Sequence, residues 1–271
     1  MTIIEQSIIG KQSQETCEDG IVTTDDFVAV IDGSTSKSPV QLSTTMRNGR
    51  FAMLVVSETI KHMPADTTCE EFCARATLAI RNEYENANAD LQLLHQSPTW
   101  RMAASATIYS REKHEIWMIG DCQCFIGNAF YENPKPSEQW LAEKRSIFIQ
   151  NALAKGSTIS QFMNEDTGRK HILSDLIKSC QRQNIDYSVI DGFPIPMKHV
   201  RIIPIPQEKK TPIVLATDGY PYLAETLQES ESLLAKHLTD DPLNIGQFKA
   251  TKGLLKGNRS FDDRAYIRFF E

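Results

Sequence analysis

The chain has 271 residues, of which 41% are hydrophobic and 24% are charged, and its formal net charge at pH 7 is -6. This balance is typical of a soluble globular protein with a sizeable core. No Pro/Gly/Ser-rich linker divides the sequence, so we expect a single domain over 1–271. The acidic charge and the lack of a basic stripe argue against nucleic acid as a partner.

The N-terminus and the cysteines indicate the compartment. No basic segment leads into a long apolar stretch and no run is long enough to span a bilayer, so we expect a cytoplasmic protein without a membrane partner. Six irregularly spaced cysteines are typical of free thiols, not of a disulfide framework or a zinc ribbon. The sequence leaves the oligomeric state open.

Apolar periodicity, turn residues and caps predict a chain rich in short strands, with helices between them. In chain order they predict strands 2–9, 21–24 and 27–31, helices 50–62 and 68–91, strands 103–110, 115–119 and 122–126, a mostly helical flank at about 134–183, strands 187–190, 199–205 and 213–217, helices 223–238 and 242–256, and a closing strand 265–270.

Carboxylates follow several of these strands directly. Asp32, Asp121 and Asp218 each stand at the end of an apolar run, and a further pair, Asp262 and Asp263, precedes the closing strand. If these strand ends converge, the acids form a cluster that needs cations, since unpaired buried carboxylates are strongly destabilising. Hard divalent metals with oxygen ligands suit such a cluster.

The hairpin of the second and third strands adds another acid. It would place Glu18 beside Asp32, close enough to share an ion. In the alternative interpretation Glu18 and Asp19 only solvate a loop, and Asp32 with Gly33 only closes a turn, since Asp-Gly is among the commonest turn dipeptides. The Asp-Gly pair that begins at Asp191 is interpreted as a turn only.

The order and context of these motifs carry a resemblance to a known family. The motifs are Glu18-Asp19, Val30-Ile31-Asp32-Gly33, Ile119-Gly120-Asp121, Leu215-Ala216-Thr217-Asp218-Gly219 and Asp262-Asp263. Together they resemble the metal-dependent protein serine/threonine phosphatases of the type 2C class, over nearly the whole chain. The resemblance implies an α+β fold, a four-layer α-β-β-α sandwich of two antiparallel sheets flanked by helices.

The resemblance also implies a metal centre and an activity. Asp32 would bridge two Mn²⁺ or Mg²⁺ ions, with the Gly33 carbonyl and Glu18 serving one ion and Asp218 and Asp262 the other. A water that bridges the ions would attack the phosphorus directly, because two ions lower its pKa and clamp the phosphoryl oxygens. The implied reaction removes phosphate from phosphoserine or phosphothreonine in a phosphoprotein substrate.

Some positions depart from the family pattern. The arginine that commonly holds the phosphate is absent, which leaves Lys11 or Lys37 as catalytic candidates for that role. A lysine offers a point charge and lacks the bidentate fork of an arginine guanidinium. An acid stands at Asp263 where Asn is frequent, so either Asp262 or Asp263 could be the ligand. Asp121 would be available to a third, weaker metal.

Other functions stay open. Loss of the arginine and the histidine that are usual in the family favours a catalytically weak or inactive pseudophosphatase that acts as a binding or regulatory module, whereas retention of every acidic position argues against it. The flank at 134–183 could restrict the substrate to one partner or to a small phosphorylated molecule. An aspartyl phosphate on Asp32 usually requires a second Asp two residues later, where this chain has Ser34.

Overall fold

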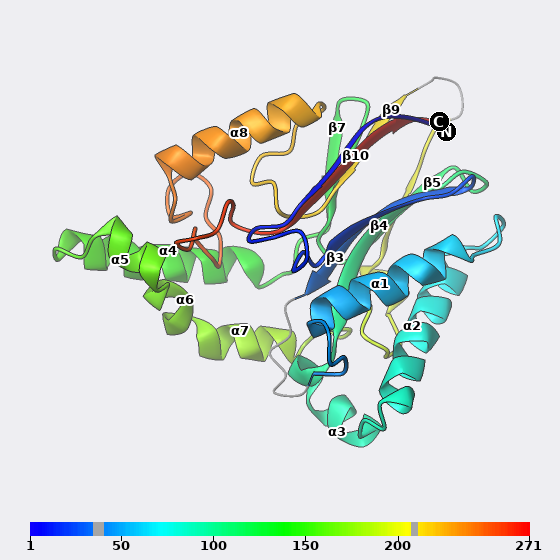
Figure 1. Cartoon of the computed structure of the whole chain (residues 1–271), viewed down its shortest axis with the longest axis horizontal. Helices are drawn as coiled ribbons and strands as arrows, with labels where there is room; N and C mark the ends of the chain where they lie inside the picture. Colours follow the sequence, from blue (N-terminus) through cyan, green and yellow to red (C-terminus); the bar gives the residue numbers. More distant parts are fainter. Residues whose placement is uncertain (35–40, 207–210) are drawn as a thin grey trace.

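The computed structural model describes residues 1–34, 41–206 and 211–271, which form two five-stranded sheets packed face to face between helices (Figure 1). The first sheet has the order β1 (Thr2–Ile9), β10 (Arg264–Phe270), β9 (Pro212–Ala216), β6 (Gln123–Ile126) and β7 (Ala129–Glu132). The second has the order β2 (Asp19–Thr23), β3 (Phe27–Ser34), β4 (Ala103–Ser110), β5 (Glu115–Ile119) and β8 (Arg201–Pro204). All neighbouring strands are antiparallel, which confirms the α+β sandwich.

Helices cover the outer faces of both sheets (Figure 1). Their bounds are α1 (Asn48–Lys61), α2 (Cys69–Asn86), α3 (Leu91–Gln96), α4 (Glu138–Ala154), α5 (Ile159–Asn164), α6 (Thr167–His171), α7 (Leu173–Cys180) and α8 (Leu227–Asp240). The helices α1 and α2 lie on the second sheet and α8 lies over the first, while α4 to α7 extend to one side where the sequence predicts a helical flank. Among the described residues, no helix combines the length and apolarity needed to cross a bilayer.

The position of β3 between two apolar layers explains why its sequence is apolar without interruption. Val30 packs between the sheets with Leu215 of β9 and Ile267 of β10. The next residue, Ile31, points to the opposite face and packs with Val56 of α1. Because successive side chains of a strand alternate between faces, a strand covered on both sides needs apolar residues throughout.

The helix expected from the capping box is present but shorter. Thr68 Oγ1 accepts a hydrogen bond from the Glu71 N–H (3.3 Å), and the Glu71 carboxylate accepts one from the Thr68 N–H (2.8 Å), as the motif predicts. The prediction that this helix continues to residue 91 is wrong. Asn88 has a left-handed φ of 52°, and Asp90 then caps the separate helix α3.

The helix predicted for 242–256 is also wrong. This segment is irregular, because the buried guanidinium of Arg145 donates to the carbonyls of Leu243 (2.8 Å) and Ala250 (3.1 Å). Asn244 has a φ of 52°, which a right-handed helix does not allow. A tertiary contact that satisfies backbone carbonyls here replaces the helical hydrogen bonds.

The Asp-Gly pair at Asp191 is more than a turn. Asp191 is fully buried and forms an ion pair with Arg101 (2.8 Å), and it also accepts a hydrogen bond from the Gln183 amide (2.8 Å). The strand expected at 187–190 is reduced to two isolated bridges, of Ile190 with Ala104 and of Tyr187 with Gln183. Asp191 is therefore a structural anchor between β4 and the chain that follows α7, since breaking a buried ion pair is strongly destabilising.

Candidate active site

The predicted carboxylates converge. A cavity of about 640 Å³ is lined by Asp32 from the end of β3, Asp121 after β5, Asp218 after β9 and Asp262 before β10. Two of these positions belong to one sheet and two to the other, so the cavity opens where the two sheets meet. Face-to-face packing of the two sheets thus brings together side chains that are far apart in the sequence.

Glycines shape the strand ends that carry the acids. A Cβ at Gly33 would lie 2.1 Å from the carbonyl oxygen of Gly49, so only glycine lets β3 end against the first turn of α1. Gly120 has a φ of 86°, a conformation that favours glycine, and it turns the chain between β5 and Asp121. These two positions fix where Asp32 and Asp121 leave the second sheet.

The residue beside Asp32 differs from the one expected. The register of β2 and β3 pairs Asp19 with Asp32, while the carbonyl of Glu18 accepts a hydrogen bond from the Gly33 N–H (3.0 Å). A Cβ at Gly49 would lie 2.4 Å from Oε1 of Glu18, so the Glu18 side chain lies against α1 and not at the cavity. Adjacent residues of an extended chain point to opposite faces, a period that could have identified Asp19 in advance.

Burial and like charges perturb the paired acids. Burial, followed by the nearby charges of Asp218 and Asp19, raises the pKa of Asp32 well above its ordinary value. Burial also raises the pKa of Asp19 to about 7, although Thr217 Oγ1 donates a hydrogen bond to its carboxylate (2.6 Å). Positive charge at this place would stabilise the ionised carboxylates.

Lysines neutralise two of the acids. Lys11 Nζ lies 2.6 Å from Oδ1 of Asp262, and Lys252 forms an ion pair with the other carboxylate oxygen. Lys135 Nζ lies 2.5 Å from Oδ2 of Asp121. Burial alone would raise the pKa of Asp121, but the Lys135 charge and the hydrogen bonds hold it below its ordinary value.

The structure bears differently on Lys11 and Lys37, the two lysines predicted to bind the phosphate. Lys37 lies outside the described residues. Lys11 is described but does not line the cavity, whereas Lys135 and Lys252 do. Sequence reasoning missed both of these, because neither Lys135, between two prolines, nor Lys252, in the segment expected to be helical, belongs to a recognisable motif.

The adjacent acids Asp262 and Asp263 have separate positions. Asp263 is 3% exposed, and its carboxylate accepts hydrogen bonds from the backbone N–H groups of Lys11 (2.7 Å) and Glu18 (3.1 Å). Asp262 is the member of the pair that lines the cavity. Asp263 therefore anchors the connection between β1 and β2, and Asp262 faces the site.

The donor set fits a hard divalent cation. Asp32, Asp218 and Asp262 offer carboxylate oxygens, which are the ligands that Mg²⁺ and Mn²⁺ prefer. Within the described ranges, neither Asp32 nor Asp218 has an ion-pair partner, and the pKa of Asp32 is raised first by burial and then by the neighbouring carboxylates. In those ranges no group of three or more His, Cys, Asp or Glu side chains is already drawn together as a metal site.

Solved structures similar to this chain cover it from end to end. The catalytic domain of the serine threonine protein phosphatase PstP, in complex with manganese ions, is 11% identical with a TM-score of 0.46, over 100% of this chain and 99% of that chain. RsbX in complex with magnesium is 13% identical with a TM-score of 0.45, over 99% and 98%. The PPM Ser-Thr phosphatase MsPP from Mycobacterium smegmatis is 12% identical with a TM-score of 0.47, over 100% and 99%.

Two of these three are phosphatases of the class that the sequence motifs resemble. A scan against protein-family models finds no match, and a search of curated proteins finds none either.

Proposed function

We propose that the protein is a metal-dependent phosphomonoesterase that removes phosphate from phosphoserine or phosphothreonine in a protein substrate. The observation that carries this proposal is the meeting of Asp32, Asp121, Asp218 and Asp262 at one cavity. Such a cluster of acids is unfavourable on its own, so its natural complement is one or more divalent cations. The single domain over 1–271 and the cytoplasmic location stay predictions.

The residues that would hold two Mn²⁺ or Mg²⁺ ions follow from their positions. Asp32, Asp218 and Asp262 would supply carboxylates, and the Gly33 carbonyl would add a neutral oxygen. Asp19, and not Glu18, pairs with Asp32 across the two strands, but neither residue lines the cavity. The bound ions would polarise the phosphoryl oxygens and lower the pKa of a coordinated water.

The chain's own cations would orient the substrate. The ammonium groups of Lys135 and Lys252 lie at the cavity wall, where they can attract the phosphoryl oxygens of a monoester. Lys11 approaches Asp262 from outside the lining and holds that carboxylate in place. The hydrogen bond that Ser105 Oγ donates to Asp121 (2.8 Å) orients this acid in the same way.

A specific observation favours a second candidate, the inactive binding module. The ion pairs of Lys135 with Asp121 and of Lys11 and Lys252 with Asp262 supply positive charge to the site from the chain itself. A protein that relied on these lysines would keep its fold without metal and would bind a phosphorylated partner without turnover. The two candidates therefore differ in whether added metal produces hydrolysis.

Hydrolysis of p-nitrophenyl phosphate by chelator-treated protein, with and without Mn²⁺, tests the proposal. We expect activity only with metal, and we expect Asp218→Asn to abolish it. Asp240→Asn, an exposed aspartate at the end of α8, is the control and should retain wild-type activity. Absence of metal-dependent hydrolysis in the wild-type protein would contradict the enzyme and favour the binding module.

A further inference from the structure

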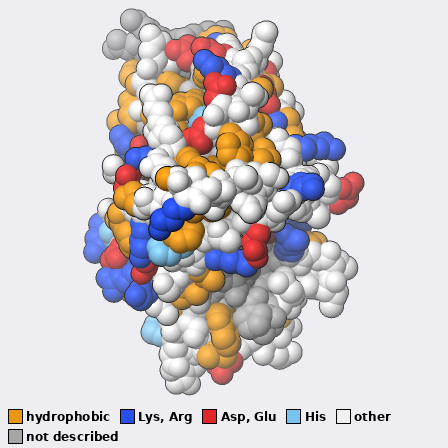
Figure 2. All heavy atoms as spheres, turned by 90° about the vertical axis from the view of Figure 1, so that its left-hand side faces the viewer, with side chains coloured by type: hydrophobic (Ala, Val, Ile, Leu, Met, Phe, Trp, Pro, Cys, Tyr) orange, Lys and Arg blue, Asp and Glu red, His pale blue; other side chains and the backbone are white. Residues whose placement is uncertain are grey.

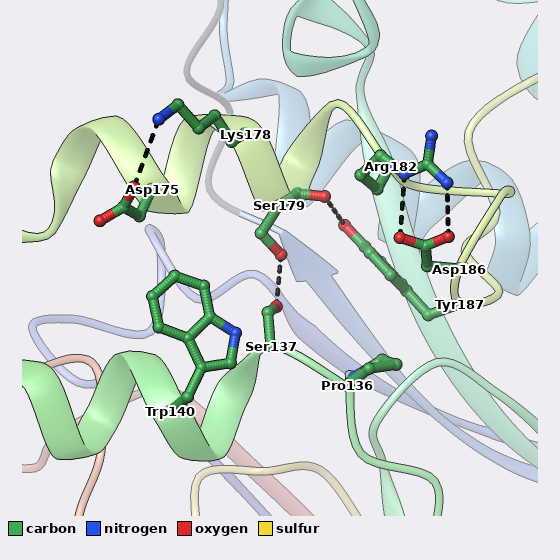
Figure 3. Close-up of a pocket in the computed structure, with 9 residues that line it drawn as sticks. All are labelled: Pro136, Ser137, Trp140, Asp175, Lys178, Ser179, Arg182, Asp186 and Tyr187. Carbon is green, nitrogen blue, oxygen red and sulfur yellow. Dashed lines mark hydrogen bonds and ion pairs between the residues drawn. The ribbon is translucent and has the colours of Figure 1, made fainter.

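A groove adjoins the candidate active site. Its volume is about 310 Å³, and it lies between the N-terminal end of α4 and the C-terminal half of α7 (Figure 3). Pro136, Ser137, Ser179 and Tyr187 line both this groove and the site cavity. The two spaces therefore adjoin at these residues, so the groove lies next to the cavity that holds the carboxylates.

An exposed aromatic side chain forms one wall of the groove. The indole of Trp140 is 48% exposed and stands between α4 and α7, pointing from its own helix toward the other (Figure 3). Tryptophan is usually well buried, and exposed aromatic residues beside a pocket are common anchors for binding partners. Pro136 and Tyr187 add apolar surface on the side that borders the site.

The charges of the groove are paired within it. Arg182 forms a two-point ion pair with Asp186 (2.9 and 2.8 Å), and Lys178 lies 3.5 Å from Asp175. The groove thus presents no net charge that would attract a second phosphate or an acidic segment. Figure 2, which views the side of the molecule toward which α4 to α7 extend, likewise shows charges of both signs interspersed with hydrophobic side chains.

Hydroxyl groups mark the border between groove and cavity. Ser137 Oγ and Ser179 Oγ are hydrogen-bonded to each other, and the Tyr187 hydroxyl donates to the carbonyl of Ser179. Serine hydroxyls can both donate and accept, so they can pair with the backbone of an extended peptide that crosses the border. Apolar surface beyond such a polar border fits a side chain of that peptide better than it fits a free metabolite.

We infer that this groove binds an apolar side chain of the substrate polypeptide, close to its phosphorylated residue. The inference rests on the proposed function, because the phosphoryl group must lie at the carboxylates while the polypeptide leaves through the mouth of the cavity. Trp140 provides the main contact, and its aromatic face selects Phe, Leu or a residue of similar kind. Trp140 is a specificity residue of the substrate and not a catalytic residue.

The test uses short phosphothreonine peptides in which a single Phe is moved through the positions on either side of the phosphothreonine. A peptide without Phe and p-nitrophenyl phosphate are the reference substrates. We expect the wild-type protein to show a lower KM when Phe stands at particular positions. Trp140→Ala should raise the KM of those peptides by about tenfold relative to the references, as expected for the loss of an aromatic anchor. Melting temperatures check that each variant is folded.

Ile147→Ala is the matched control. Ile147 lies on the same helix, is 50% exposed and is outside the groove, so its removal should leave the preference for Phe unchanged. A preference that survives in Trp140→Ala, or that is absent in an active wild-type protein, would overturn this inference and leave the proposed function intact. Failure of the wild-type protein to hydrolyse any of the substrates with Mn²⁺ would instead overturn the proposed function, and the inference with it.

Discussion

Asp19 and Asp32 lie directly opposite each other on the paired strands β2 and β3, and Asp32 lines the cavity where the two sheets meet. Asp19 is 4% exposed, and burial is the main cause of the raised pKa of both carboxyl groups. The two carboxylates also repel each other when both are ionised, and a cation bound at Asp32 would reduce this repulsion. In the proposed metal centre, this pair would therefore couple metal binding to the stability of the fold.

The first prediction concerns pH. A carboxyl whose pKa is raised in the folded state favours folding when it is protonated, and this stability is lost as pH rises from its unfolded pKa toward its folded one. For Asp19 this window runs from the ordinary value of 3.8 to about 7. We therefore expect metal-free Asp19→Asn to become more stable than wild type as pH rises from about 4 to about 7, by an amount on the order of a few kcal/mol.

Urea unfolding across this pH range measures the difference. Asp240→Asn, at an exposed position, should follow the wild-type protein at every pH. A constant difference between Asp19→Asn and wild type would show that Asp19 does not titrate in this window.

The second prediction separates the adjacent acids before β10. Asp263→Ala leaves the half-buried N–H of Lys11 and the buried N–H of Glu18 without their acceptor, so it should lower the free energy of unfolding by about 1–3 kcal/mol. Asp262→Ala should affect stability less and Mn²⁺ affinity more, because Asp262 lines the cavity. Urea unfolding and calorimetric titration with Mn²⁺ measure the two effects. The reverse pattern would assign the ligand role to Asp263.

The third prediction concerns the Lys135 ammonium, which pairs with Asp121. Lys135→Met removes the ammonium from Asp121, which lies 2.5 Å away, and frees this carboxylate to bind a further ion. We expect calorimetry to detect an additional weak Mn²⁺ ion in this variant. Lys61→Met, which breaks an exposed ion pair with Glu58 on α1, is the control and should bind Mn²⁺ as wild type does. Equal numbers of bound ions in wild type and Lys135→Met would refute the idea that the lysine competes with metal.

The fourth prediction concerns the irregular segment that carries Lys252. Arg145 is fully buried, and it joins Asp166 (2.8 Å) to the carbonyls of Leu243 and Ala250. Arg145→Met removes the donor to the buried carbonyls of Leu243 and Ala250 and breaks the ion pair with Asp166, so it should lower the free energy of unfolding by about 3–5 kcal/mol.

Arg182→Met provides the comparison, since its pair with Asp186 has similar geometry but lies at the surface, with side chains 53% and 44% exposed. This variant should change stability by about 1 kcal/mol or less. Equal losses for the two arginines in urea unfolding would mean that burial does not decide the strength of these pairs.

Much of the sandwich could be predicted from local sequence. The apolar run of β3 and the capping box at Thr68 act within a few residues, and both are found where expected. In both cases the decisive interaction lies in the same stretch as the signal. Local sequence also marked Asp32, Asp121 and Asp218 as acids at the ends of buried strands, whereas their meeting at one cavity depends on the packing of the two sheets.

The misses have a common physical cause, which is long-range contact. The segment 242–256 is irregular and not helical, because its carbonyls accept hydrogen bonds from Arg145. Asp191, expected only to form a turn, is held by a buried ion pair with Arg101. Lys135 and Lys252 reach the cavity from connecting segments that carry no motif. The error over Asp19 has a local cause, since the alternation of side chains along β2 could have indicated that Asp19, and not Glu18, lies opposite Asp32.

The most direct test of the central claim is the rate of phosphothreonine peptide hydrolysis as Mn²⁺ is added to chelator-treated wild-type protein and to Asp32→Asn. Asp32 lines the cavity where the two sheets meet and is a ligand in the proposed metal centre, so its carboxylate should be indispensable. We predict a saturable rise in rate for wild type and a loss of at least about a hundredfold in the variant, with the fold intact. Wild-type rates in Asp32→Asn, or no response of the wild-type protein to Mn²⁺, would contradict a metal centre built on this aspartate.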